Sequence, residues 1–156
     1  MTEPLRWCLD WNHLSRKEKF LKGAPFLATE DRAYRDIVRQ LETRTVSQIE
    51  EWARFPRDVQ DLARRISQAL KNDGVWPSEL FLPDDPADIP FALHFDFTDK
   101  WDSRHYSIDL IEERLGIEIP IDFWERLATM SFAAAITEIC RNKAEQSVAT
   151  ERSTAG

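Results

Sequence analysis

The sequence predicts an all-α fold, and three observations support that prediction. In the segments 34–41, 59–70 and 132–139, apolar residues recur at the spacing that gathers them on one face of a helix. Residue types that commonly cap helix N-termini stand before several predicted helices. Only four of the 156 residues are glycine, which argues against an all-β protein with many tight turns.

The composition is that of a soluble domain with its own core. Hydrophobic residues make up 42% of the chain and include six tryptophans and nine phenylalanines. No apolar run approaches the ~20 residues of a membrane-spanning helix, and residues 1–6 lack the pattern of a secretory signal. We therefore expect a cytoplasmic protein. Cys8 and Cys140 form no CxxC spacing, and we expect both to be reduced and at least partly buried.

The net charge of −7 is concentrated in one block of the chain. Residues 76–125 contain thirteen acids and three bases, whereas residues 1–75 and 126–156 are slightly basic. Such a block repels a phosphate backbone, which argues against nucleic-acid binding. It suits a basic protein partner, and it also fits a plain solvated acidic face.

Residues 1–55 are predicted to form a helical extension that packs on the rest of the chain. A Ser-x-x-Glu capping box opens each of two short predicted helices, over about 15–22 and 47–54. Between them, the apolar spacing predicts a helix over about 29–43, with Thr29 as its N-cap.

The most regular helical spacing covers residues 56–71, with Pro56 suited to the first turn and residues 72–74 ending the helix. The stretch 75–102 then contains four prolines, which break regular elements, and many apolar side chains. A stretch of this kind in a compact domain is usually functional or packed as a lid. Within it, residues 91–97 alternate as a strand would.

An acidic amphipathic helix is predicted from about Ser103 to Leu115. Its apolar and acidic residues separate onto opposite faces, with Ile108, Ile111 and Leu115 on the first and Asp109, Glu112 and Glu113 on the second. Gly116 stands where a left-handed C-terminal cap is expected. Pro120 prevents the next helix from starting earlier.

Two further helices complete the predicted fold. A short helical turn is expected around residues 123–127, and a last helix over 132–141 is capped by Ser131 or Thr129. The small, polar remainder, residues 142–156, is predicted to be a frayed tail.

This order of elements resembles the acyl carrier protein family over residues 56–141. The most specific part is Leu110-Ile111-Glu112-Glu113-Arg114-Leu115-Gly116-Ile117-Glu118-Ile119-Pro120, which is similar to the end of the family's partner-recognition helix and its following loop. Ser131-Phe132 looks like the start of the family's last helix. The resemblance implies a small, non-catalytic four-helix bundle that carries phosphopantetheine on a serine.

The serine motif departs from the family's pattern. Asp102 and Ser103 are followed by Arg104 instead of the usual leucine, and Ser103 is about two residues too close to Gly116. Two residues turn a side chain by about 200° around a helix, and an ungapped alignment puts Trp101 at the serine position. Ser103 is the candidate attachment residue if the helix begins with a two-residue deletion. Otherwise Ser103 or Asp102 is a helix cap.

The resemblance also implies which residues meet a partner and an acyl chain. The partner-binding acids would be Asp102, Asp109, Glu112, Glu113 and Glu118. The residues sheltering an acyl chain would be Ile108, Leu110, Ile111, Phe132 and Ile136, which fit an ordinary core equally well.

Two other classes of function stay open. A helical bundle with an acidic face could be an adaptor or immunity-type protein that binds a basic partner without a prosthetic group. Five potential metal ligands also fall within twelve residues, namely His94, Asp96, Asp99, Asp102 and His105, although their spacing matches no established motif. We predict a monomeric, non-enzymatic, acyl-carrier-like protein that docks on a basic protein.

Overall fold

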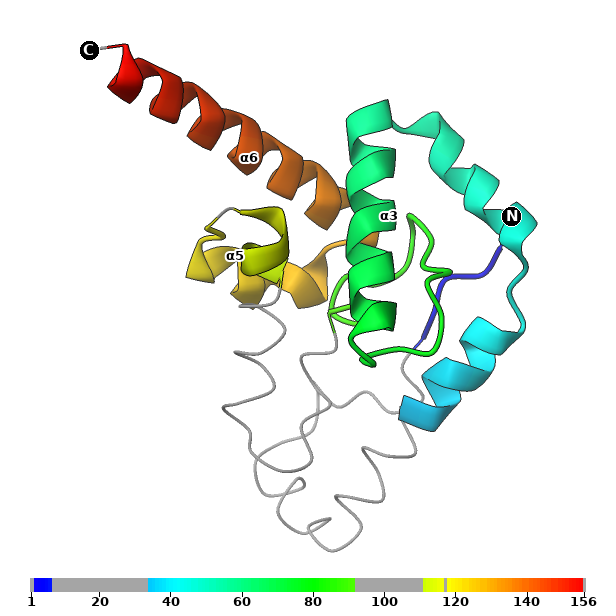
Figure 1. Cartoon of the computed structure of the whole chain (residues 1–156). Helices are drawn as coiled ribbons and strands as arrows, with labels where there is room; N and C mark the ends of the chain where they lie inside the picture. Colours follow the sequence, from blue (N-terminus) through cyan, green and yellow to red (C-terminus); the bar gives the residue numbers. More distant parts are fainter. Residues whose placement is uncertain (1, 7–33, 92–110, 117, 156) are drawn as a thin grey trace, which may run out of the picture.

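The structure, a computed structural model, describes residues 2–6, 34–91, 111–116 and 118–155. Over these residues the regular elements are helices and no strand occurs, which confirms the all-α class. Helices α3 and α6 pack together, and the described residues of the segments before and between them lie around this pair (Figure 1). The four-helix arrangement of the carrier family stays a prediction.

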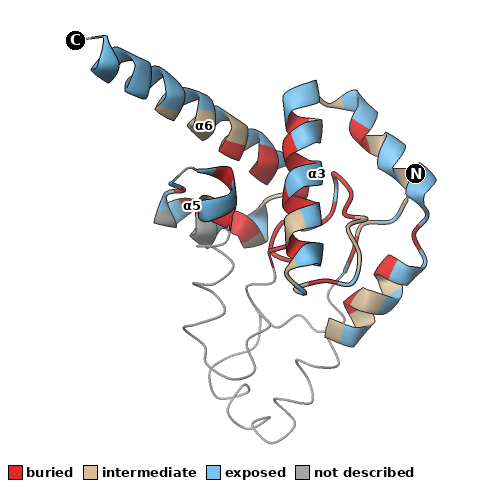
Figure 2. Cartoon of the chain, in the orientation of Figure 1, coloured by how far each residue is buried: buried red, intermediate tan, exposed pale blue. Residues whose placement is uncertain are grey.

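Helix α3, Arg57–Asn72, is the helix that the sequence predicts most directly. Pro56 is its N-cap, and Gly74 follows its end with φ of +78°, a conformation that glycine adopts without strain. Its buried side chains are Val59, Leu62, Ala63, Ile66, Ser67 and Leu70. They recur every three or four residues, so α3 buries one face and exposes the other (Figure 2).

Helix α6, Phe132–Thr154, begins as predicted and continues much further. The Ser131 hydroxyl accepts a hydrogen bond from the Ala134 N–H at 3.2 Å, which confirms Ser131 as the N-cap. The prediction of a frayed tail from residue 142 differs from the structure, in which the helix runs on to Thr154. Residues 142–154 contain neither Gly nor Pro and are rich in good helix formers, so the backbone bonding pattern continues beyond the buried part of the helix.

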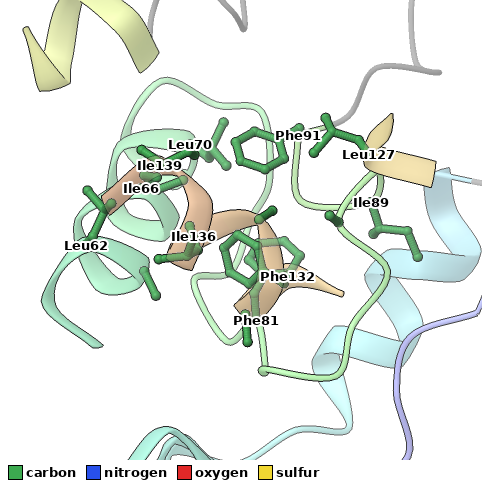
Figure 3. Packing of buried hydrophobic residues seen from close by; sticks show 14 of the residues in the cluster. Leu62, Ile66, Leu70, Phe81, Ile89, Phe91, Leu127, Phe132, Ile136 and Ile139 are labelled. Atoms are coloured by element: carbon green, nitrogen blue, oxygen red, sulfur yellow. The ribbon is translucent and has the colours of Figure 1, made fainter. Parts of the chain in front are cut away.

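The core lies between α3, α6 and the stretch that precedes the acidic helix. Figure 3 shows Leu62, Ile66 and Leu70 of α3 facing Ile136 and Ile139 of α6. Aromatic rings from residues 75–91 fill the end of this interface, and Phe132 meets the Phe81 ring edge-to-face at 6.0 Å and the Phe91 ring at 6.1 Å. Such ring pairs add to the stability that burial of their area supplies.

Residues 75–91 form an irregular but buried layer, as predicted for a stretch packed as a lid. Two indole N–H groups hold it: Trp52 donates to the Phe81 carbonyl and Trp76 to the Pro90 carbonyl, both at 2.9 Å. These bonds satisfy polar atoms that burial would otherwise leave without water. The strand considered for residues 91–97 lies outside the described residues beyond Phe91.

A buried ion pair joins this layer to the segments before α3. Arg44 donates to both carboxylate oxygens of Asp85, at 2.6 and 2.7 Å, and the two side chains are 3% and 0% exposed. Asp85 also accepts from the N–H groups of Leu5 and Leu82, at 2.9 and 2.7 Å. The charges are thus both paired and hydrogen-bonded, the condition under which buried ions are tolerated.

The described extension is helical, with one correction to the predicted boundaries. Residues 34–42 are α-helical, and the next element is a 3₁₀ helix, η2, Val46–Arg54. Its capping box uses Thr45 and Gln48, and the Gln48 side-chain oxygen accepts from the Thr45 N–H at 2.8 Å. The predicted box starting at Ser47 is wrong because Thr45-x-x-Gln48 satisfies the same pattern two residues earlier, and the Ser47 hydroxyl instead meets that of Thr45.

The elements between the acidic helix and α6 follow the prediction. Helix α5, Ile121–Arg126, begins directly after Pro120, and the 3₁₀ helix η3, Leu127–Thr129, completes the short turn. Arg126 pairs with Glu138 of α6 at 2.6 Å. This pair ties α5 to the base of α6.

Several predictions fall outside the described residues. These are Cys8, the helix over 15–22 and the first part of the helix over 29–43. Cys140 is half-buried, as predicted, and it forms no disulfide with another described residue. Burial raises the pKa of its thiol, and the nearby Asp58 raises it further.

Candidate functional site

The end of the acidic helix forms a tight turn. Residues 111–115 are helical, and Ile111 and Leu115 are buried as their spacing predicts. Gly116 has φ of +65° and donates its N–H to the Glu112 carbonyl at 2.8 Å, which confirms the predicted left-handed cap. An added Cβ at Gly116 would meet nothing within 4 Å, so glycine is favoured there by backbone conformation and not by space.

Glu112 is used by the turn itself. Its Oε1 accepts a hydrogen bond from the Ile119 N–H at 3.1 Å, and the residue is half-buried. The carboxylate therefore links the end of the helix to the residue before Pro120, and a backbone N–H offsets part of its negative charge.

Glu113 and Glu118 are the two acids of this region whose side chains are available to a partner. Both are exposed, and neither forms an ion pair with another described residue. Gln146 of α6 holds the backbone of Glu118, because its amide donates to the Glu118 carbonyl at 2.7 Å and accepts from the N–H at 3.4 Å. We call Glu113, Gly116 and Glu118 the acidic turn.

A groove lies beside this turn, between α3 and residues 111–115. It has a volume of about 260 Å³ and is lined by Arg65, Ile66, Gln68, Ala69, Asn72, Ile111, Arg114 and Leu115. Arg114 reaches across to Asp73 at 3.3 Å. Aliphatic side chains therefore lie beside exposed polar ones, an arrangement that accepts an amphipathic group.

A second, smaller groove separates η2 from α3. Its volume is about 180 Å³, and its lining includes Ile49, Trp52 and Phe81. The sequence does not predict this surface, because the apolar residues of the short helix expected over 47–54 do not show which of them stay exposed. In the structure Ile49 is 39% exposed and Val46 is 74% exposed. Exposed aliphatic residues on one short helix are the feature that indicates a binding surface here.

The predicted attachment residue Ser103 and the candidate metal cluster from His94 to His105 lie outside the described part of the chain. So do two of the predicted partner-binding acids, Asp102 and Asp109. Within the described residues, no three potential ligands gather around a common point.

The residues proposed to shelter an acyl chain divide into two groups. Ile111 is among the residues that line the groove beside the acidic turn, although it is only 1% exposed. Phe132 and Ile136 are fully buried in the core and line neither groove. Ile108 and Leu110 lie outside the described residues.

Comparison of the chain with protein-family models, with curated proteins and with solved structures finds no match. Among the helices that the structure describes, none is long and apolar enough to cross a membrane. The acidic turn and its groove are therefore the features from which a function can be inferred.

Proposed function

We propose that this protein is a non-enzymatic docking module that binds a basic protein partner through its acidic turn. The observation that carries the proposal is the pair of exposed carboxylates, Glu113 and Glu118, on a turn whose backbone is held by Gln146 and capped by Gly116. Charges on a fixed backbone lose little freedom when a partner binds, so they favour association more than charges on a loose chain.

The size of the neighbouring groove supports a protein partner over a small-molecule substrate. Its 260 Å³ volume lies below the ~300–1,000 Å³ of typical small-molecule sites. It is large enough for one protruding side chain of a partner. An apolar anchor in a shallow groove, with charged contacts around it, is a common arrangement at protein interfaces.

The charge of the whole region supports a basic partner. Residues 76–125 carry ten more acids than bases, and such a field steers a positively charged surface toward the turn. Two arginines line the groove. Arg114 is paired with Asp73, so Arg65 is the remaining positive charge that would oppose a basic partner.

The acyl-carrier resemblance is one form of this proposal. Its docking helix is the acidic helix, and Ser103 would carry the phosphopantetheine arm if the chain is a working carrier. An adaptor or immunity-type protein would use the same acidic turn without an arm. Docking through Glu113 and Glu118 is proposed for either case.

Charge reversal at the turn tests the proposal. The protein carrying Glu113→Lys with Glu118→Lys is compared with a control carrying Glu42→Lys with Glu50→Lys, two exposed acids on the extension. The partner is recovered by co-purification from the native host, and its association rate is measured across salt concentrations. We expect about tenfold slower association for the turn variant at low salt, and near wild-type rates for the control.

Two results would count against acidic docking. One is a binding rate that does not change with salt, since a charge-steered encounter weakens as ions screen it. The other is an equal loss in the turn and control variants, because that would report the net charge and not the position of the acids.

A further inference from the structure

Exposed aliphatic side chains lie in a row on the 3₁₀ helix η2. Residues three apart stand one above the other on a 3₁₀ helix, so Val46, Ile49 and Trp52 share one side of η2. Their exposed fractions fall from 74% at Val46 through 39% at Ile49 to 6% at Trp52. The row therefore begins in solvent and ends in the core, and its outer part is an apolar surface open to solvent.

The inner end of this row is one wall of the smaller groove, which we call the η2 groove. The α3 side of the groove and its remaining lining are formed by Gln60, Asp61, Ala63, Arg64, Ser67, Gln68, Glu79 and Phe81. The Trp52 indole is held by its hydrogen bond to the Phe81 carbonyl at 2.9 Å. The wall is thus fixed before anything binds, which keeps the ordering cost of binding small.

Two polar side chains of the η2 groove have no partner among the described residues. Ser67 is only 4% exposed, and its hydroxyl forms no hydrogen bond with another described residue. Glu79 is half-buried and forms no ion pair with one, whereas Asp61 and Arg64 pair with each other at 3.1 Å. A buried hydroxyl and a half-buried carboxylate are both more stable with a partner. The groove therefore suits an occupant that carries an aliphatic side chain, a hydroxyl and a cation.

The distal part of α6, residues 147–154, carries these three groups. Val148 is 47% exposed and is the remaining large aliphatic side chain that is exposed among the described residues. Arg152 stands on the same face one turn later, is exposed, and forms no ion pair with another described residue. The Ser147 hydroxyl donates to the Lys143 carbonyl at 3.0 Å, so its oxygen remains able to accept from the Ser67 hydroxyl.

The distal part of α6 cannot reach the η2 groove of its own copy. Residues 132–154 form one continuous helix without Gly or Pro, so the helix has no residue at which a sharp kink is expected. Its C-terminal end and residues 46–54 lie on opposite sides of α3 (Figure 1). Only a second copy of the chain can therefore place its distal helix in this groove.

We propose that the distal part of α6 of one copy docks in the η2 groove of a second copy, with Val148 against Ile49 and Arg152 beside Glu79. The contact joins two different surfaces, so the copies associate head to tail. One helical segment in a groove is a small interface. We therefore expect association at protein concentrations of about 0.1–1 mM, with the predicted monomer at lower concentrations. These residues are separate from the acidic turn, and the proposal does not depend on docking there.

Two complementary variants test the contact in the full-length chain. Val148→Glu damages the distal helix and leaves the groove intact, whereas Ile49→Lys damages the groove and leaves the helix intact. Sedimentation equilibrium measures the average mass at concentrations up to about 1 mM, and the monomer has 18.3 kDa. We expect each variant alone to self-associate about tenfold more weakly than the wild type. An equimolar mixture should associate again, because it contains one intact helix and one intact groove.

Matched controls carry the same charge changes on the same two helices. Thr150→Glu lies about 200° around the helix from Val148, and Ala53→Lys is at an exposed position of η2 that does not line the groove. Both should associate as the wild type does. A wild-type protein that stays monomeric at the highest concentration, a mixture that stays monomeric, or an equal loss in the controls would overturn the proposal.

The proposed ion pair supplies a second measurement that leaves the apolar residues unchanged. Glu79→Lys or Arg152→Glu alone brings like charges together and should weaken self-association about threefold. In a mixture of these two proteins, each distal helix meets a groove of opposite charge on the other protein, so association should return to the wild-type level. A mixture that associates no better than the separate variants would contradict the placement of Arg152 beside Glu79.

Discussion

At the scale of single residues, Arg44 and Asp85 form a buried ion pair that joins several of the described segments. Asp85 accepts four hydrogen bonds, two from Arg44 and two from backbone N–H groups, while its own carbonyl accepts from the Phe132 N–H at 2.7 Å. One residue therefore joins the 2–6 segment, the helical extension, the buried layer and the first turn of α6. A polar network of this kind is stable only while every member is present.

Removal of the Asp85 carboxylate is expected to be severe. Asp85→Ala leaves the Arg44 guanidinium buried without its counter-ion, which costs about 3–5 kcal/mol of unfolding free energy. The neighbouring Asp84 is the matched control, because its pair with Arg54 is about half exposed, and Asp84→Ala should cost about 1 kcal/mol or less. Urea denaturation of both variants measures the difference, and equal losses would contradict the assignment.

The thiol of Cys140 gives a pH-dependent prediction at the same scale. Burial raises the pKa of Cys140 above that of an unfolded thiol, so its stabilising contribution is complete below the unfolded pKa of about 8.5. That contribution is lost as pH rises through the folded pKa, because the unfolded chain releases its proton first.

The comparison that isolates this effect uses Cys8→Ser protein with and without Cys140→Ala. Urea midpoints are measured from neutral to alkaline pH. Above the unfolded pKa, the midpoint of the protein that keeps Cys140 should fall relative to that of the Cys140→Ala protein. A difference that is independent of pH would contradict a raised thiol pKa, since tyrosines and lysines titrate alike in both proteins.

At the scale of elements, α6 is one continuous helix whose two parts differ in burial. Its first part is buried against α3, whereas the part after Gln146 is exposed (Figure 2). Gln146 marks the change, because its amide is bonded to the backbone of Glu118. The distal part is stabilised by its local sequence and the first part by burial.

Truncation separates these two sources of stability. Ending the chain after Gln146 should lower the helical circular dichroism signal, yet change the unfolding free energy by less than about 1 kcal/mol, since no described side chain beyond it is buried. Ile139→Ala, in the buried part, should instead cost about 2–5 kcal/mol. Urea denaturation distinguishes the two, and a large loss on truncation would mean that the distal helix packs on something.

At the scale of the whole molecule, the acids of the turn belong to a block, residues 76–125, that carries ten more acids than bases. The described acids at the turn are exposed, and the groove beside the turn has a volume of about 260 Å³. A carrier and an adaptor would both use the proposed docking surface, and they differ in whether the chain carries a prosthetic arm.

Intact-mass spectrometry decides between them. The chain is incubated with coenzyme A and a broad-specificity phosphopantetheinyl transferase, and the Ser103→Ala variant is treated alongside. Because Arg104 replaces the usual leucine and the spacing to Gly116 is shortened, we expect no mass gain. A gain that disappears in Ser103→Ala would establish a working carrier, whereas a gain in both proteins would place the modification elsewhere.

The sequence by itself determined the local elements that depend on neighbouring residues. Helix α3, the cap at Ser131, the turn at Gly116 and the start of α5 after Pro120 were all predictable, because each follows from backbone preferences or from apolar spacing over a few residues. The exposure of Glu113 was predictable for the same reason.

Only the tertiary structure decided which distant residues meet. Arg44 and Asp85 are 41 positions apart and Gln146 is 28 positions from Glu118, and no local pattern pairs them. The same holds for the exposure of Ile49 and for the burial of Leu5, whose N–H donates to Asp85, 80 positions further along the chain. Burial and pairing are properties of the assembled core, and the sequence specifies them only through the complete fold.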